Sequence, residues 1–257
     1  MCRPTFYDVK YSINPWMNFR NSVDSEKAQN QWQLLVSKIE SLGANVLVMD
    51  GDPEFPDLVF TANAGITLKI NTIIPARFLH PERQGEEPIY QKWFKANDYS
   101  FCDPPEVSFE GAGDALYFGQ ELVGAHGFRS DPRIYEGWTE TVVRLVDPYF
   151  YHLDTCFCPL KNGDYLIWDG AFDENSLKKI EKLGGQKISV PENEARSFVC
   201  NAVLVGDNVI LPSGCEKTME ELKEKGYTPH PVDMSEFIKA GGACKCLTLE
   251  LPKRFKE

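Results

Sequence analysis

A cysteine near the C-terminal end of the chain is placed where a nucleophile could act. Cys246 closely follows the glycine pair Gly241 and Gly242, and glycines allow positive φ angles and leave space for a ligand beside a sulfur. Alternating leucines after the cysteine predict a half-buried strand over residues 246–251 that would anchor the thiol. The alternative is a core cysteine without chemistry, because free cysteines are among the most buried residues.

Acidic, amide and imidazole side chains recur in short motifs elsewhere in the chain. Asn63 lies in FTANAG, Glu110 and Asp114 lie in FEGAGD, and His152 and Asp154 lie in YHLD. Taken alone, Asn63 and Glu110 could be turn residues, and His152 could be a hydrogen-bonded core histidine. Together with a thiol, however, an imidazole and several carboxylates are the groups needed to attack a planar cationic carbon and to protonate its leaving amine.

A repeating order of hairpins and helices is predicted around these motifs. Pairs of short strands around a turn are indicated at residues 61–75, 113–127, 153–169 and 201–212. Helices are predicted at residues 24–42, 86–96, 131–146, 173–184 and 216–226, and further strands at 45–50 and 186–190. The order strand, strand, helix, strand recurs about every 40 to 50 residues, which is typical of a repeat architecture.

About five such modules fit into 257 residues. We expect the first residues, 6–14, to pair with the strand at 246–251 and close the modules into a ring, which would remove exposed sheet edges. The inner hairpin ends of a ring meet at its axis, so the motif residues would share one site. The chain is expected to form a single domain over residues 1–257.

Charge and hydropathy restrict the partners of the chain. The formal net charge of −11 argues against nucleic acid and favours the approach of a small cation. No run of about eighteen apolar residues is present, and the first residues lack the apolar core of a signal peptide. We therefore expect no membrane association and a cytoplasmic location, where the eight cysteines would be reduced.

The motifs resemble the guanidine-modifying enzyme superfamily, which includes arginine deiminases, dimethylarginine hydrolases, amidinotransferases and arginine dihydrolases. The resemblance rests on FTANAG, FEGAGDAL, the His-Leu-Asp triplet and the C-terminal Gly-Gly before Cys-Leu-Thr, and it covers essentially the whole chain. It implies an α/β fold, a five-bladed α/β propeller (pentein) of ββαβ modules with pseudo-fivefold symmetry, closed by N- and C-terminal strands. Asn-Pro-Trp-Met at residues 14–17 and FTANAG are most similar to the arginine dihydrolase branch.

The resemblance also implies a role for each motif residue. Cys246 resembles the nucleophile, His152 the general acid and base, Asp154 a carboxylate that holds the guanidinium, and Glu110 the second acidic residue. FEGAGD is one residue longer than the Glu-Gly-Gly-Asp form common in the family, so Glu110, Asp114 or both could contact the substrate. The implied reaction is hydrolysis of L-arginine through a covalent thiouronium intermediate, without a cofactor or a metal.

Asn63 departs from the family pattern. Deiminases and amidinotransferases usually carry Phe-Thr-Arg-Asp where this chain has Phe-Thr-Ala-Asn. An amide can hold a cationic guanidinium through its oxygen and a neutral urea through either group. We therefore expect a second round on the ureido group, giving ornithine, carbon dioxide and two ammonia. The alternatives are a dimethylarginine dimethylaminohydrolase or an arginine deiminase that stops at citrulline. An amidinotransferase is less favoured, because it would need to exclude water and admit an amine acceptor.

The other end of an amino-acid substrate needs a partner for its α-carboxylate, which arginine can bind bidentately. Arg77, Arg83 and Arg129 are candidates, and Arg129 is favoured because it follows the second hairpin, as the family's carboxylate-binding arginine does. Asn14 could reach the site from the closing module. The sequence leaves open whether the chain forms a homo-oligomer.

Two interpretations without catalysis are alternatives to an enzyme. The Cys-X-Cys pairs 156/158 and 244/246, with His152 nearby, could form a zinc-binding module. The spacing argues against zinc, since structural zinc motifs usually separate their cysteines by two to four residues. A propeller that only binds ligands is the other reading, and the joint presence of a nucleophile, a histidine and acids argues against it.

Overall fold

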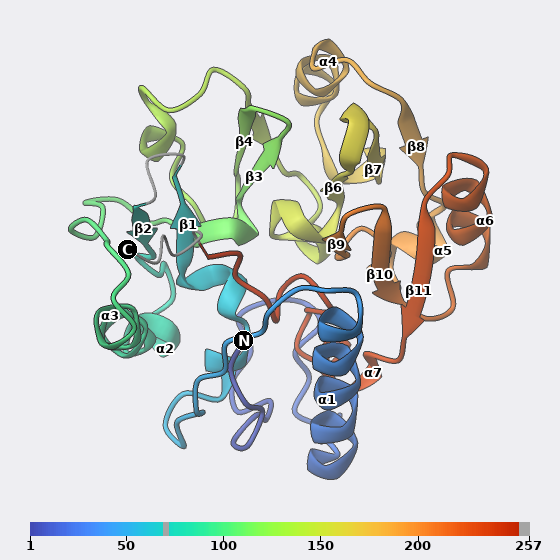
Figure 1. The fold of residues 1–257 in the computed structure, drawn as a ribbon. Helices are drawn as coiled ribbons and strands as arrows, with labels where there is room; N and C mark the ends of the chain where they lie inside the picture. Colours follow the sequence, from blue (N-terminus) through green and yellow to red (C-terminus); the bar gives the residue numbers. More distant parts are fainter. Residues whose placement is uncertain (69–71, 252–257) are drawn as a thin grey trace.

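The structure is a computed structural model that describes residues 1–68 and 72–251. It is a mixed α/β fold of four small sheets, and Figure 1 shows the sheets following one another around the centre of the molecule, with α1, α3, α4 and α6 toward the outside. The helices are α1 (Ser25–Ser41), α2 (Pro81–Gln84), α3 (Glu86–Ala96), α4 (Glu174–Lys182), α5 (Glu192–Ala195), α6 (Glu216–Glu224) and α7 (Ser235–Ile238). The strands are β1 (Gly65–Thr67), β2 (Ile73–Pro75), β3 (Ala115–Phe118), β4 (Glu121–His126), β5 (Val142–Arg144), β6 (Phe157–Pro159), β7 (Tyr165–Ile167), β8 (Lys187–Ser189), β9 (Val203–Val205), β10 (Asn208–Pro212) and β11 (Thr228–Val232).

Three of the four sheets share one topology. In β3-β4-β5, β6-β7-β8 and β9-β10-β11, the first two strands form an antiparallel hairpin and the third strand pairs parallel to the second. Helix α4 connects β7 to β8, and helix α6 connects β10 to β11. The β1-β2 hairpin follows a similar course, because an isolated parallel bridge joins Ile73 of β2 to Phe101, which follows α3. The four predicted hairpins are confirmed.

The helix predicted over residues 131–146 is wrong. This segment holds one 3₁₀ turn, Pro132–Tyr135, and then strand β5. Proline suits the first position of a helix, but Gly137 has a φ of 78° and two valines at 142 and 143 favour a strand. The other four predicted helices are confirmed by α1, α3, α4 and α6, and the strand predicted at 186–190 is confirmed by β8.

The strands predicted to close the ring are wrong within the described part of the chain. Residues 244–247 form a turn, and neither 246–251 nor 6–14 is a strand. The backbone after the turn instead reaches the first hairpin, where Ala62 N donates to Cys246 O at 3.0 Å and Thr61 Oγ1 donates to Leu247 O at 2.9 Å. Of the strand predicted at 45–50, the structure shows an isolated parallel bridge between Met49 and Cys2.

Helix α1 begins and ends where the sequence predicts. Asp24 caps it, because its Oδ1 accepts a hydrogen bond from Lys27 N at 2.9 Å. Gly43, with a φ of 95°, follows its last turn. The apolar face packs against the C-terminal part of the chain, and α1 lies beside α7 (Figure 1). Within residues 1–68 and 72–251, no helix has the length and apolar character needed to cross a membrane.

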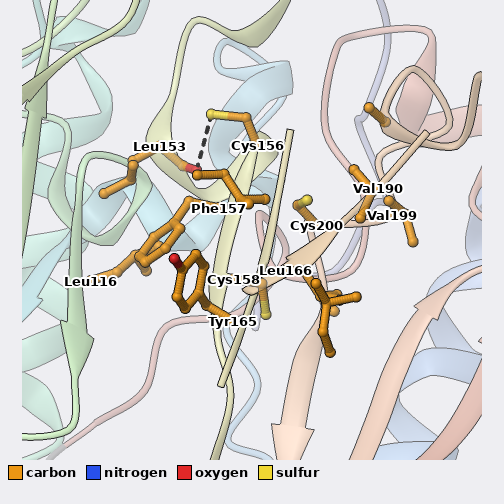
Figure 2. Packing of buried hydrophobic residues seen from close by; sticks show 14 of the residues in the cluster. Leu116, Leu153, Cys156, Phe157, Cys158, Tyr165, Leu166, Val190, Val199 and Cys200 are labelled. Carbon is orange, nitrogen blue, oxygen red and sulfur yellow. Dashed lines mark hydrogen bonds between the residues drawn. The ribbon is translucent and has the colours of Figure 1, made fainter. Parts of the chain in front are cut away.

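The largest apolar core supports one of the motifs. Its members drawn in Figure 2 include Leu116, Phe157, Tyr165, Leu166, Val199 and Cys200. Leu153 is fully buried in this core, and its carbonyl accepts a hydrogen bond from Cys156 Sγ at 3.5 Å (Figure 2). The 3₁₀ turn Leu153–Thr155 is therefore held between the core and the centre of the molecule, with His152 before it and Asp154 within it.

Candidate active site

Short turns before the hairpins bring the motif residues together. The 3₁₀ turns Thr61–Ala64, Gly111–Gly113 and Leu153–Thr155 lead into β1, β3 and β6. They place Asn63 and His152 in the wall of one pocket with Cys246. The pocket is narrow, and it is lined by Ile13, Asn14, Met17, Asp57, Phe60, Asn63, Arg83, Arg129, Tyr151, His152, Ala240, Gly241 and Cys246.

Cys246 lies on the turn 244–247 and faces this pocket. Its thiol donates to Asp154 Oδ2 at 3.4 Å, and Asn201 Nδ2 donates to the sulfur at 3.1 Å. Burial and the negative charge of Asp154 raise the pKa of the thiol well above its ordinary value. The thiol is therefore neutral near pH 7 unless a cation lies beside the sulfur, which would favour the thiolate.

Asp154 lies behind the thiol and is 1% exposed. Its Oδ1 has no hydrogen-bond partner among the described residues, whereas its Oδ2 accepts from Cys246. Burial raises the pKa of Asp154 to about 7, although the positive charge of Lys245 opposes this effect. Asp154 is not among the residues that line the pocket, but a buried carboxylate oxygen without a partner beside a thiol suits the N–H groups of a cation.

His152 and Glu110 form a pair beside Arg129. His152 Nε2 lies 2.8 Å from Glu110 Oε2, and Arg129 Nη1 donates to the same oxygen at 3.0 Å. Burial alone would raise the pKa of Glu110, but Arg129 and the hydrogen bond with His152 hold it well below its ordinary value. A carboxylate that stays ionised at this distance orients the imidazole, which can then transfer protons at a leaving group.

Asn63 is fixed by an arginine. Arg83 Nη1 donates to Asn63 Oδ1 at 2.9 Å, and Asn63 Nδ2 donates to Glu110 O at 3.3 Å. Arg83 is itself held by Glu86, to which it donates two hydrogen bonds of 2.8 and 2.7 Å. Gly113 leaves room for the amide, because a Cβ there would lie 2.4 Å from Asn63 Nδ2. The pocket wall at this point is therefore a neutral amide backed by a guanidinium.

The arginines proposed from the sequence for the substrate carboxylate lie in different places. Arg129 and Arg83 line the pocket, and Arg129 Nη2 donates to Ile13 O at 3.0 Å. Arg77 does not line it: its backbone pairs with Phe109 and its side chain is exposed. Asn14 does line the pocket, where its Nδ2 donates to Ala240 O at 3.0 Å.

Asp114 lies behind the pocket wall and is not among the residues that line it. Ser130 Oγ donates to its Oδ2 at 2.7 Å, and Leu153 N donates to its Oδ1 at 3.3 Å. Burial raises the pKa of Asp114 to about 6. Of the two acids in FEGAGD, Glu110 therefore contacts His152, and Asp114 holds the turn that follows His152.

Two polar residues of the site were not singled out from the sequence. Asp57 is a buried carboxylate in the pocket wall, and Asn201 contacts the sulfur of Cys246. Asn201 precedes the fourth hairpin as Asn-Ala, just as Asn63 precedes the first, so the recurrence of that pair was an available signal. Asp57 lies in Phe-Pro-Asp-Leu, where no pattern distinguishes it from a turn residue.

The zinc reading finds no support in the geometry. Among the residues that the structure describes, no group of three or more His, Cys, Asp or Glu side chains is placed to hold a metal ion. Cys156 Sγ donates to the carbonyl of Leu153, and Cys246 contacts Asp154 and Asn201. The cysteines of the two Cys-X-Cys pairs are all buried and unpaired by disulfides.

Two curated relatives and a family model resemble the chain. Residues 12–119 match the family described as N,N dimethylarginine dimethylhydrolase, eukaryotic. The bifunctional arginine dihydrolase/ornithine cyclodeaminase ArgZ of Synechocystis sp. is 44% identical over 98% of this chain, which spans only 37% of that relative. The N(G),N(G)-dimethylarginine dimethylaminohydrolase of Mycobacterium tuberculosis is 36% identical over 98% of this chain and 84% of its own length.

Solved structures of the N-terminal domain of ArgZ share the fold. This domain, described as an arginine dihydrolase of the cyanobacterial ornithine-ammonia cycle, was solved as a cysteine-to-serine variant bound to substrate. It matches with a TM-score of 0.91 at 41% identity, over 98% of this chain and 97% of that one. An asparagine-to-serine variant, covalently bound to a reaction intermediate, matches with a TM-score of 0.90 at 42% identity, over 97% and 95% of the two chains. The chain therefore belongs to the guanidine-modifying enzyme superfamily, in its arginine dihydrolase branch.

Proposed function

We propose that this chain hydrolyses the guanidinium carbon of L-arginine and acts as an arginine dihydrolase. Arginine and two waters would give ornithine, carbon dioxide and two ammonia. The observation that carries the proposal is the Cys246 sulfur, which faces one pocket with His152 and Asn63 and contacts Asp154. The names of the ArgZ protein and its N-terminal domain support the same activity.

Thiolate formation is the first step. A guanidinium beside the sulfur offsets the burial and the Asp154 charge that raise the pKa of Cys246, so substrate binding favours the reactive form. The sulfur attacks the guanidinium carbon to form a tetrahedral adduct. His152 protonates the departing nitrogen, ammonia leaves, and a covalent thiouronium remains. His152 then takes a proton from the water that hydrolyses this intermediate to citrulline.

The second round acts on the ureido group of citrulline. Attack by the sulfur and loss of ammonia leave a thiocarbamate, and water releases a carbamate that breaks down to ornithine and carbon dioxide. Asn63 serves both rounds, because its amide does not require a positively charged partner. The amidinotransferase alternative requires an amine in place of water, and no feature of the pocket favours that exchange.

The α-end of the substrate is assigned to the charged side chains of the pocket wall. Arg129 is the proposed partner of the α-carboxylate, with Arg83 as a second cation in the wall and Asn14 beside them. Asp57 places a carboxylate in the same wall, where it suits an α-ammonium group. Arg77 is not retained as a binding residue, because its side chain is exposed outside the pocket.

Product analysis tests the proposed function. Purified protein is incubated with arginine, citrulline and dimethylarginine in parallel, and ornithine, citrulline and ammonia are quantified. We expect two ammonia per arginine, with ornithine as the final product and no turnover in the Cys246→Ser variant. Citrulline accumulating with one ammonia per arginine would contradict the dihydrolase proposal while leaving a deiminase. Activity on dimethylarginine alone would instead support the second candidate.

That second candidate is a dimethylarginine dimethylaminohydrolase. The matched family model and the relative from Mycobacterium tuberculosis favour it. Asn63 favours the dihydrolase, because a neutral amide accommodates a neutral ureido group. We therefore expect the Asn63→Asp variant to release a larger fraction of citrulline than the unaltered protein. The exposed Asn193→Asp change on α5 is the matched control, and an unchanged product ratio in Asn63→Asp would remove Asn63 as the determinant.

We propose further that residues 1–257 form one catalytic domain, a five-bladed propeller of ββαβ modules. The shared topology of three sheets supports four of the blades together with β1-β2. The fifth would combine residues 1–3, α1 and the segment around Met49 with the C-terminal segment, which the Cys2–Met49 bridge supports. A small cationic guanidino substrate, a cytoplasmic location and a homo-oligomer remain proposals from the sequence.

A further inference from the structure

Asn201 lies directly behind the nucleophile. It precedes β9, is completely buried, and is not among the residues that line the pocket. The backbone N–H of Asn201 donates to Phe198 O at 2.9 Å, and Phe198 adopts a left-handed φ of 62°. A bulky residue in this conformation is uncommon, so the backbone before Asn201 is held in a specific bend.

The side-chain oxygen of Asn201 organises the turn that carries Cys246. Asn201 Oδ1 accepts hydrogen bonds from Ala243 N and Cys246 N, both at 3.1 Å. Its backbone carbonyl accepts a third bond from Lys245 N at 3.1 Å. Three backbone N–H groups, two in the turn and one just before it, are therefore tied to one residue that precedes β9.

The same contacts settle which way the amide of Asn201 points. Backbone N–H groups can only donate, so the atom facing Ala243 and Cys246 must be the oxygen. The Nδ2 group then faces two acceptors, Asp154 O at 3.0 Å and the Cys246 sulfur at 3.1 Å. One Nδ2–H of Asn201 therefore points at the Cys246 sulfur, and the other polar groups of the side-chain amide are held by Asp154 O, Ala243 N and Cys246 N. A hydrogen bond to an ionised acceptor is stronger than one to a neutral acceptor, so this donor favours the thiolate over the thiol.

We propose that Asn201 is a further catalytic residue, whose Nδ2–H stabilises the Cys246 thiolate from the side opposite the substrate. The inference rests on the proposed function, in which the sulfur is a thiolate when it attacks and again when it is expelled. Asp154 places a carboxylate on the same sulfur, which opposes ionisation. Asn201 supplies a neutral donor against that charge without occupying the pocket, so it acts on the sulfur and not on substrate binding.

Alkylation of Cys246 tests the proposal directly. Asn201→Asp keeps the oxygen for the turn but loses the donor, and Asn201→Leu loses the donor without adding charge. Iodoacetamide labelling of Cys246 is followed by peptide mass spectrometry across a pH series. We expect both variants to react about tenfold more slowly or worse at a given pH, with the pH profile moved upward. Asn208→Asp is the control, because the half-buried Asn208 lies on β10 away from the pocket. Slow labelling in Asn201→Asp alone, with Asn201→Leu at the unaltered rate, would overturn the proposal.

A second measurement follows the side-chain amide of Asn201 by NMR and does not depend on a stable Asn201 variant. The side-chain amide of Asn201 in ¹⁵N-asparagine-labelled protein should shift with the same pH midpoint as the labelling of Cys246, and it should not shift in Cys246→Ser. An amide that ignores the ionisation of the sulfur would overturn the proposal. Labelling needs no arginine, so these results stand even if the protein fails to hydrolyse arginine. If it does hydrolyse arginine, kcat should fall about tenfold in Asn201→Asp while KM changes little.

Discussion

Two buried carboxyl groups of the site, Glu110 and Asp154, have pKa values shifted in opposite directions. Glu110, beside Arg129 and His152, has a pKa well below its ordinary value, whereas Asp154, beside a neutral thiol, has a pKa raised to about 7. The first is therefore a fixed anion that orients the imidazole. The second gains its negative charge most easily when a cation arrives. Such a difference distinguishes a carboxylate that orients His152 from a carboxylate whose charge depends on the groups beside it.

The raised pKa of Asp154 predicts how stability depends on pH. The folded-state pKa of about 7 lies above the ordinary value of 3.8, so the folded protein binds this proton more tightly than the unfolded chain. Its contribution to stability is complete below about pH 4 and is lost as pH rises through about 7. Between pH 8 and pH 5, it should add about 3 kcal/mol to the free energy of unfolding.

Urea unfolding of the unaltered protein and Asp154→Asn at pH 5 and pH 8 measures this contribution. The variant should lose about 3 kcal/mol of the stability difference between the two pH values, since its amide does not titrate. The exposed Asp207→Asn change serves as the control and should keep the full difference. Equal pH dependence in Asp154→Asn and the unaltered protein would show that Asp154 does not bind the proton.

The turn at Gly241, before Cys246, requires glycine for two reasons: its positive φ and the lack of space for a Cβ. Gly241 has a φ of 85°, and a Cβ there would lie 2.8 Å from Tyr151 Oη and 2.9 Å from Trp16 Cδ1. Gly214 has the same φ of 85°, but a Cβ there would have no neighbouring atom within 4 Å. The two glycines therefore separate the cost of the backbone angle from the cost of crowding.

Alanine at each glycine tests this distinction. Gly214→Ala should cost about 1 kcal/mol of stability, the penalty of a left-handed backbone, and leave arginine turnover unchanged. Gly241→Ala should also displace the pocket wall, so kcat/KM should fall about tenfold or more. Thermal unfolding and steady-state kinetics on both variants provide the comparison. Equal kinetics in the two variants would show that crowding at Gly241 does not affect the pocket.

Local patterns predicted the hairpins and most helices, because alternation, caps and glycine stops act within a few residues. Asp24 and Gly43 bound α1 as expected. The strand expected after Cys246 failed because its backbone groups are used by distant partners, Asn201 at one end of the turn and Thr61 at the other. No short pattern reveals such partners. The sequence predicted Asn63, His152 and Cys246 as site residues because each lies in a recognisable motif. Asp57 lies in no such motif, and only its position in the pocket identifies it.

At the scale of the whole molecule, charge at the surface and charge in the pocket have different effects. The chain carries a formal net charge of −11, while the pocket wall contains Arg83 and Arg129 with Asp57. The long-range field therefore attracts cations, whereas the pocket wall presents charges of both signs. Attraction over distances greater than about 10 Å is screened by salt, whereas contacts inside a buried pocket are screened much less.

The ionic-strength dependence of turnover tests whether the net charge steers the substrate. Arginine carries a net positive charge at neutral pH and citrulline does not, so the two substrates share an α-end and differ in attraction to the protein. Raising sodium chloride from about 0.05 to 0.5 M should lower kcat/KM for arginine about threefold or more and leave kcat nearly unchanged. For citrulline, kcat/KM should change little over the same range. An equal fall for both substrates would show that salt acts on the protein itself or on the shared α-end, and the net charge would then have no part in substrate capture.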